Sequence, residues 1–171
     1  MPVRDLFLLP HRVFVGALIA SVCLASGCLS HKPAEPIAGP VAAPDLLFKP
    51  GPTDDDAPEE FTTTKSGLKY RILRKSDGRK PNAKSTVTCH YKGWLDNKTV
   101  FDSSYKNGEA ISFRLDNVIS GWTEGLQYVA VGGMIELELP GDLGYGTSGS
   151  VQGGIPPNAT LHFIVELLAI D

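Results

Sequence analysis

The strongest constraint on the fold is a period of two in the apolar residues of the last two thirds of the chain. Turn signals such as Asp77-Gly78 and Asp96-Asn97 separate the periodic stretches. Apolar residues that alternate with polar ones are typical of antiparallel strands that bury one face. The sequence therefore predicts strands in the stretches 68–73, 87–92, 111–115, 134–139 and 161–167.

One stretch between these strands has a different character, and it reads V-I-S-G-W-T-E-G-L over residues 118–126. Gly121 and Gly125 bracket a run that holds about two helical turns, and Ser120 is a candidate N-cap. Trp122 lies inside this run, and burying an indole removes about 150–250 Å² from water. We expect an α+β fold, in which a curved antiparallel sheet (a half-barrel) wraps around one short helix. On this stretch alone, Trp122 is either core or part of a site.

Composition excludes several functions. The chain has 171 residues, and its net charge of −3 lacks the basic excess that nucleic-acid binding requires. Its three cysteines and four histidines show no zinc-type spacing. We therefore expect no metal, no cofactor and no nucleic-acid partner.

The first 28 residues have the features of an export signal. Arg4 and Arg12 precede an apolar run over 13–25, which is too short for an ordinary membrane-spanning helix. The small residues 25–27 then precede Cys28, an order that resembles a bacterial lipoprotein signal in which the cysteine is acylated. Ala25 departs from that pattern, which prefers leucine there. An ordinary signal peptide cut nearby is the alternative.

The stretch 29–60 is rich in proline and alanine and ends in acidic residues, with no apolar period. Such a composition buries too little to offset its ordering entropy. We expect a disordered tether, which as a flexible coil spans roughly 30 Å. The folded domain is then 61–171.

Few residues of this domain carry chemistry that can be recognised alone. Asp102 beside Phe101, in a predicted loop, is the most notable carboxylate, although these residues alone favour a turn residue that caps the next backbone groups. We expect His90 to point outward into solvent. Tyr91, Phe113 and Phe163 share the helix-facing parity of their strands. If these aromatic side chains line a concave face, they form an apolar pocket.

Five motifs occur in an order that resembles the FKBP-type peptidyl-prolyl cis-trans isomerases, over residues 67–171. They are H-Y-K-G (90–93), F-D-S-S (101–104), V-I-S-G-W-T-E-G (118–125), Y-G (145–146) and I-P-P-N-A-T-L-x-F (155–163). Each motif is weak alone, whereas the ordered set is highly specific. The resemblance implies an apolar pocket between a half-open sheet and one helix.

The resemblance also implies roles for single residues. Trp122 corresponds to the pocket floor. The backbone N–H of Ile119 and the hydroxyl of Tyr145 correspond to groups that bond the bound peptide or macrolide. The catalytic set that it implies is Tyr91, Phe101, Asp102, Trp122, Tyr145 and Phe163, and the substrate-binding set is Val118, Ile119, Ile111 and Ile155.

Several positions depart from the family pattern. Ile111 stands where phenylalanine is frequent, and Asn107 replaces a basic residue near Asp102. The lid loop 147–154 is rich in glycine and serine, and it lacks the histidine of the family.

The resemblance implies an isomerase that assists the folding of exported proteins and binds proline-containing polypeptides and macrolide inhibitors. With the lipoprotein-type signal, we expect a monomer in the cell envelope, periplasmic or extracytoplasmic, held to a membrane by a lipid on Cys28. Two alternatives are open: a proline-binding chaperone module with little turnover, and a structural lipoprotein with a vestigial pocket.

Overall fold

The structure is a computed structural model that describes residues 49–171. The predicted signal, Cys28 and the first part of the predicted tether lie outside the described residues. Within 49–171, no helix combines the length and the apolar character that crossing a membrane requires.

One antiparallel sheet forms the framework of the domain. Its strands lie in the order β1-β2-β6-β7-β3-β4, and β5 also pairs with β3. The strands are β1 (Thr62–Thr63), β2 (Lys69–Arg74), β3 (Thr86–Leu95), β4 (Val100–Ser103), β5 (Ile111–Arg114), β6 (Met134–Leu139) and β7 (Leu161–Ile170). The five strands that the sequence predicts are confirmed as β2, β3, β5, β6 and β7.

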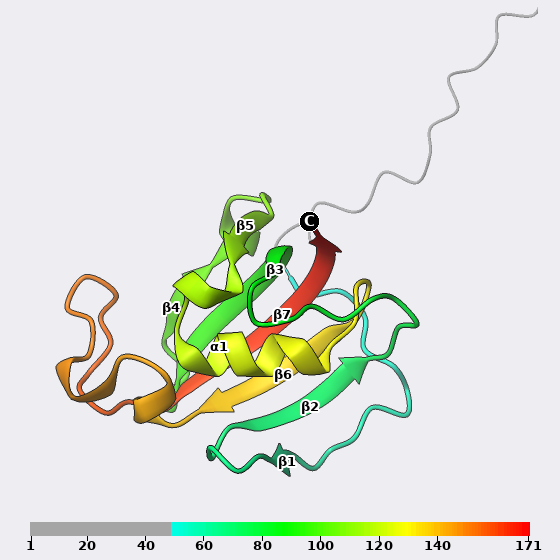
Figure 1. Ribbon diagram of the computed structural model, residues 1–171. Coiled ribbons are helices and arrows are strands. Elements are labelled where there is room, and N and C mark those ends of the chain that lie inside the picture. The colour runs from blue at the N-terminus through cyan, green and yellow to red at the C-terminus, as the bar shows by residue number, and fades with distance from the viewer. Residues whose placement is uncertain (1–48) are drawn as a thin grey trace, which may run out of the picture. The chain divides into compact units, whose positions relative to one another are not determined.

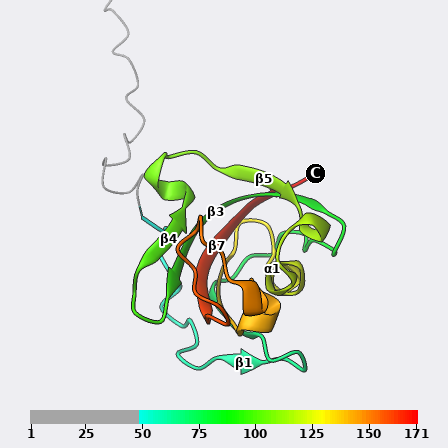
Figure 2. The ribbon, with the colours of Figure 1, turned by 90° about the vertical axis from the view of Figure 1, so that its left-hand side faces the viewer.

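The period of two divides the sheet into an inner and an outer face. The inner residues of β6 and β7, such as Ile135 and Val165, pair across the strands and are fully buried. Seen nearly along α1, the sheet curves around the helix (Figure 2). The predicted α+β half-barrel is therefore confirmed.

The one α-helix of residues 49–171, α1 (Ser120–Gly125), lies across the inner face of the sheet (Figure 1). Glycine permits this close approach, since a Cβ on Gly121 would lie 2.3 Å from Leu139 Cδ2. The prediction of Ser120 as N-cap is wrong. Ile119 is the N-cap residue, and the Ser120 hydroxyl instead donates to the carbonyl of Leu143 at 3.3 Å.

Two strands and a set of single-turn helices were not predicted. Phe101 and Asp102, which the sequence places in a loop, lie in β4 and pair with β3. β1 is only two residues long. The 3-10 helices are Ser104–Lys106, Leu115–Asn117, Leu126–Tyr128, Gly141–Leu143 and Gly146–Ser148.

Residues 51–60, which we call the N-terminal strap, differ from the predicted tether. The backbone N–H of Gly51 donates to Glu166 at 2.9 Å, and that of Asp54 donates to the carbonyl of Leu73 at 2.8 Å. Arg71 Nη1 donates to the carbonyl of Glu59 at 2.9 Å. The strap contains few apolar residues. The polar contacts hold it against the sheet instead.

Candidate functional site

A cavity of about 170 Å³ opens between α1 and the inner face of the sheet. Six elements or their flanking loops contribute to its lining. The lining residues are Tyr91, Phe101, Asp102, Ile111, Phe113, Val118, Ile119, Trp122, Tyr145 and Phe163. The structure thus brings together all of the candidate residues of the domain except Ile155, and it includes Phe113, which strand parity placed on the helix-facing side.

Trp122 forms the base of this cavity. Its ring lies 5.1 Å from that of Tyr91 and 5.1 Å from that of Phe163, both nearly edge-on, and 5.2 Å from that of Phe113. The side chain is only 5% exposed and belongs to the buried core cluster. Trp122 therefore serves as core and as cavity wall, so the two sequence interpretations do not exclude each other.

Gly93 is a site residue that sequence reasoning missed. The rings of Phe101 and Phe163 meet edge-on above it, with centroids 5.5 Å apart. A Cβ on Gly93 would lie 2.7 Å from each ring. A glycine in the middle of a strand marks close approach of another group, and this signal was present in the H-Y-K-G motif.

The polar side of the cavity is a paired phenol and carboxylate. The hydroxyl of Tyr91 donates to Asp102 Oδ2 at 2.5 Å, and the N–H of Ser103 donates to Asp102 Oδ1 at 2.8 Å. Asp102 thus caps a backbone group, as the alternative interpretation expects, and also faces the cavity. Burial, together with the Asp102 carboxylate, raises the pKa of Tyr91 well above its ordinary value. The phenol is therefore a neutral donor at physiological pH.

The rim of the cavity is more exposed than its base. Ile111 and Tyr145 are each 42% exposed. Tyr145 lies between Gly144 and Gly146, and Gly146 has a φ of +58°, a left-handed conformation that suits glycine. The tyrosine therefore lies in a sharp turn at the mouth of the cavity.

Ile155 is the candidate that the structure places elsewhere. Ser150 and Ile155 form an antiparallel bridge, with hydrogen bonds of 2.8 and 2.9 Å in the two directions. This bridge turns the loop back on itself, and Ile155 is 5% exposed within the core cluster. It does not line the cavity, and its contact with substrate stays a prediction.

Both histidines of the described domain lie outside the cavity lining. We expected His90 to point freely into solvent, and this is wrong. Its ring stacks on Tyr105 at 5.0 Å, and its Nδ1 lies 3.1 Å from Ser104 Oγ. His162 Nε2 contacts Asp96 at 2.7 Å. Across 49–171, no group of three or more His, Cys, Asp or Glu side chains is arranged to hold a metal ion.

Comparisons with known proteins agree with this geometry. The model of a family described as FKBP-type peptidyl-prolyl cis-trans isomerase matches residues 77–168. The isomerase FkpA of Escherichia coli K12 is 48% identical over 108 residues, which are 63% of this chain and 39% of that protein. This chain thus matches well under half the length of that relative.

Solved structures show the same fold. The crystal structure of E. coli FkpA superposes with a TM-score of 0.63 at 46% identity, over 67% of this chain and 53% of that one. A peptidyl-prolyl cis-trans isomerase of Pseudomonas syringae superposes with a TM-score of 0.61 at 34% identity, over 67% of this chain and 83% of that one.

Proposed function

The chain belongs to the family of FKBP-type peptidyl-prolyl cis-trans isomerases, and on that premise we propose that it catalyses the rotation of X-Pro peptide bonds in polypeptides. The observation that carries this proposal is the aromatic cavity with Trp122 at its base and a single carboxylate, Asp102, at its side. The cavity volume of about 170 Å³ accommodates a proline ring. We assign the catalytic roles to Tyr91, Phe101, Asp102, Trp122, Tyr145 and Phe163.

The chemistry requires no nucleophile. An X-Pro bond rotates over a barrier of about 18–20 kcal/mol, which is mostly lost amide resonance. In the twisted state the carbonyl is less polar and the proline nitrogen is pyramidal. A site that binds this state better than either planar state accelerates rotation, and each ~1.4 kcal/mol of that preference gives about tenfold in rate.

The aromatic walls supply that preference by excluding water. Water stabilises the polar planar amide more than the twisted one, so transfer into a dry cavity raises the free energy of the planar states relative to the twisted state. Phe101 and Phe163, which meet edge-on, line the cavity and would enclose the ring of proline. The N–H of Ile119 and the hydroxyl of Tyr145 then orient the flanking carbonyls of the substrate.

The substrates that we propose are unfolded, exported polypeptides, and macrolides are proposed as inhibitors. This proposal rests on the export signal of residues 1–28 and on the tether that follows it. We propose that Cys28 is acylated and holds a monomer in the cell envelope. Labelling with radioactive palmitate, compared between the wild type and Cys28→Ser, tests the anchor separately from the activity.

The isomerase proposal is tested by a proline peptide assay on the purified protein. We expect Trp122→Leu and Phe101→Ala to lower kcat/KM by tenfold or more and Asp102→Leu to lower it less, while the domain stays folded. Trp94→Leu is the matched control, because Trp94 is the other tryptophan of the chain and stacks on His162 outside the cavity. Activity that is absent from the wild type, or unchanged in the cavity variants, contradicts the proposal.

A proline-binding chaperone module is the second candidate, and one observation favours it. Among the described residues, four large apolar side chains are exposed, and three of them lie on the cavity rim or on the adjoining loop, namely Ile111, Tyr145 and Val151. Apolar surface around a pocket mouth suits the capture of unfolded chains. Suppression of the aggregation of an unfolded protein, without acceleration of a proline peptide, is the result that distinguishes this function.

A further inference from the structure

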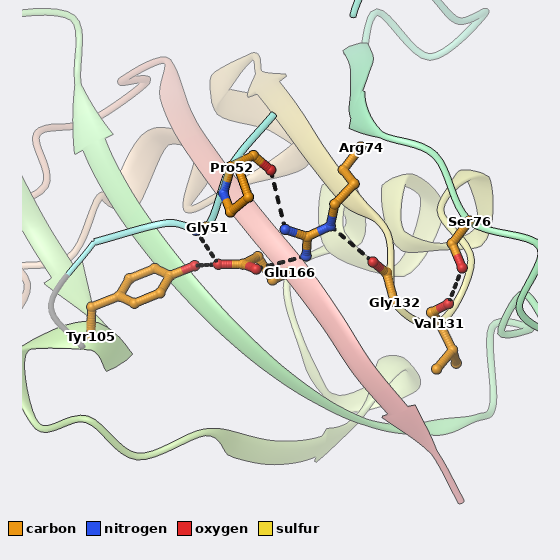
Figure 3. Close-up of polar contacts among 8 residues, drawn as sticks. All are labelled: Gly51, Pro52, Arg74, Ser76, Tyr105, Val131, Gly132 and Glu166. Atoms are coloured by element: carbon orange, nitrogen blue, oxygen red, sulfur yellow. Dashed lines mark hydrogen bonds and ion pairs between the residues drawn. The ribbon is translucent and has the colours of Figure 1, made fainter. Parts of the chain in front are cut away.

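A carboxylate on the outer face of the sheet joins three segments that are distant in sequence. Glu166, on β7, accepts hydrogen bonds from the hydroxyl of Tyr105 at 2.5 Å and from the N–H of Gly51 at 2.9 Å. Arg74 Nη2 lies 2.7 Å from its other oxygen. Figure 3 shows these groups converging on one carboxyl group. Glu166 is only 9% exposed, so this is a buried charge with a full set of donors.

The N-terminal strap is an integral part of this cluster. Gly51 supplies one donor to Glu166, and the carbonyl of Pro52 accepts from Arg74 Nη1 at 3.2 Å. Arg74 Nε also donates to the carbonyl of Gly132 at 3.0 Å, which ties the strap to the loop before β6 (Figure 3). The strap precedes the segment that the family model matches, so the family assignment gives it no role.

The same cluster continues toward the cavity through Tyr105. The ring of Tyr105, which is 4% exposed, stacks on His90. His90 and the buried Ser104 are in polar contact at 3.1 Å. Ser104 Oγ accepts from the backbone N–H of Tyr91 at 2.8 Å. The hydroxyl of Tyr91 is the group that pairs with Asp102 in the cavity.

We propose that the Glu166 cluster, closed by the N-terminal strap, positions the Tyr91–Asp102 pair of the cavity. Tyr105 and Glu166 are positioning residues in this proposal, since neither lines the cavity. Both ends of the path are hydrogen-bonded. Tyr105 and Glu166 are buried, whereas Tyr91 is half-buried and Asp102 is exposed at the cavity. The short 3-10 helix Ser104–Lys106 carries Ser104 and Tyr105 as one unit. Holding Tyr105 therefore holds Ser104, and Ser104 fixes the backbone of Tyr91. This inference rests on the proposed function, because it assigns a role in the same cavity.

The charge of Glu166 explains why the strap matters to the cluster. Burial by itself raises the pKa of this carboxyl, but the hydrogen bonds from Tyr105, Gly51 and Arg74 outweigh burial and lower the pKa below its ordinary value. The group is therefore ionised at neutral pH. Loss of the Gly51 donor leaves a buried anion with one bond fewer, which costs more than the loss of an exposed bond. The carboxylate then shifts toward its remaining donors or toward water, and Tyr105 shifts with it.

Kinetics of full-length variants test the proposal, first in the wild-type protein and then in Tyr91→Phe. Gly51→Pro removes the N–H donor, and Glu166→Gln removes the charge. Glu138→Gln is the matched control, because Glu138 makes an ion pair with Lys69 at 2.7 Å on the same face and has no path to the cavity. We expect the first two variants to lower kcat/KM by about three- to tenfold, the range of a lost buried hydrogen bond, and the control to stay within about twofold.

A second background distinguishes positioning from general destabilisation. In Tyr91→Phe the Asp102 bond is already lost, so Gly51→Pro and Glu166→Gln should lower kcat/KM by less than about twofold there, as coupled residues do in double-mutant cycles. Effects that multiply in the double variants, or that equal those of Glu138→Gln, overturn the proposal. If Glu166→Gln does not fold, Tyr105→Phe replaces it, because that change keeps the ring that stacks on His90.

Amide hydrogen exchange gives a readout that does not depend on activity. The N–H of Tyr91 donates to Ser104 Oγ, so loosening the cluster should speed its exchange. We expect exchange at Tyr91 to be about tenfold faster in Gly51→Pro and Tyr105→Phe than in Glu138→Gln, because local opening of the cluster, not global unfolding, exposes this N–H. Unchanged exchange contradicts the positioning role. An inactive wild type with the expected exchange contradicts the isomerase function alone.

Discussion

Replacing Gly93 with alanine tests whether the cavity walls need the contact that glycine allows. The added Cβ would lie 2.7 Å from Phe101 Cζ and 2.7 Å from Phe163 Cε1. Carbon atoms prefer separations of about 3.5–4.0 Å, so one or both rings must move by roughly 1 Å. Phe163 is 4% exposed and packed in the core, whereas Phe101 is half-buried. We therefore expect Phe101 to move into the cavity.

Two magnitudes follow from this displacement. Overpacking of this kind lowers the free energy of unfolding by about 1–3 kcal/mol. A misplacement of about 1 Å at a reacting site costs up to about 100-fold in rate, so we expect kcat/KM to fall by tenfold or more. Denaturant unfolding measures the first effect, and a proline peptide assay under conditions where the variant is fully folded measures the second.

Gly67→Ala is the control for this comparison. Gly67 has a φ of +88° and lies outside the cavity lining, so alanine there costs about 1–2 kcal/mol through backbone strain without reaching Phe101 or Phe163. The reasoning is refuted if Gly93→Ala keeps wild-type kcat/KM. It is also refuted if Gly67→Ala, at equal loss of stability, loses as much activity.

Three further predictions concern the framework of the domain. Gly121→Ala should lower the free energy of unfolding by about 1–3 kcal/mol in guanidinium titrations, because its Cβ would lie 2.3 Å from Leu139 Cδ2 and push α1 off the sheet; wild-type stability contradicts this packing. Burial raises the pKa of Cys89 to about 12, so iodoacetamide at pH 8 should label it only as fast as the domain unfolds, and rapid labelling of the folded protein refutes the assignment. The pKa of Glu166 is lowered on folding, so its contribution to stability is present above its unfolded pKa of about 4.3 and is lost as pH falls through the lower folded value. Unfolding titrations should therefore show a shallower acid loss of stability for Glu166→Gln than for the wild type, and parallel curves rule this linkage out.

Much of the sheet was predictable because burial imposes a period of two on strands with one dry face. Cys89 and Val165 follow this period, and the starts of their strands were predicted to within one residue, whereas β3 and β7 each run three residues past the predicted ends. β4 was missed because its four residues are too few to show a period, and Asp102 interrupts the apolar pattern. β1 has only two residues and no apolar signal at all.

The strap could not be predicted because its stability has no local signature. It is held by Gly51 and by the carbonyls of Pro52 and Glu59, whose partners lie in β2 and β7. Composition gives the low apolar content of the strap, but it does not indicate which distant charged side chains form hydrogen bonds with its backbone.

The candidate site was predicted mainly from the family resemblance and from strand parity. Parity placed Tyr91 and Phe163 on the inner face, and the structure has both at the cavity. Ile155 does not line the cavity, because it bridges with Ser150 and packs in the core, and its contact with substrate stays a prediction. The role of Gly93 was missed because close contact between Phe101 and Phe163 depends on three-dimensional geometry.

The measurement that tests the central claim most directly is exchange NMR of an X-Pro peptide with a trace of the folded protein. Uncatalysed interconversion takes about 10–100 s. If the cavity binds the twisted amide, the exchange rate should rise in proportion to protein concentration, while the ratio of cis to trans peptide stays constant, and Trp122→Leu should abolish the increase. Peptide resonances that shift on binding with no increase in the exchange rate would contradict catalysis and leave a proline-binding module.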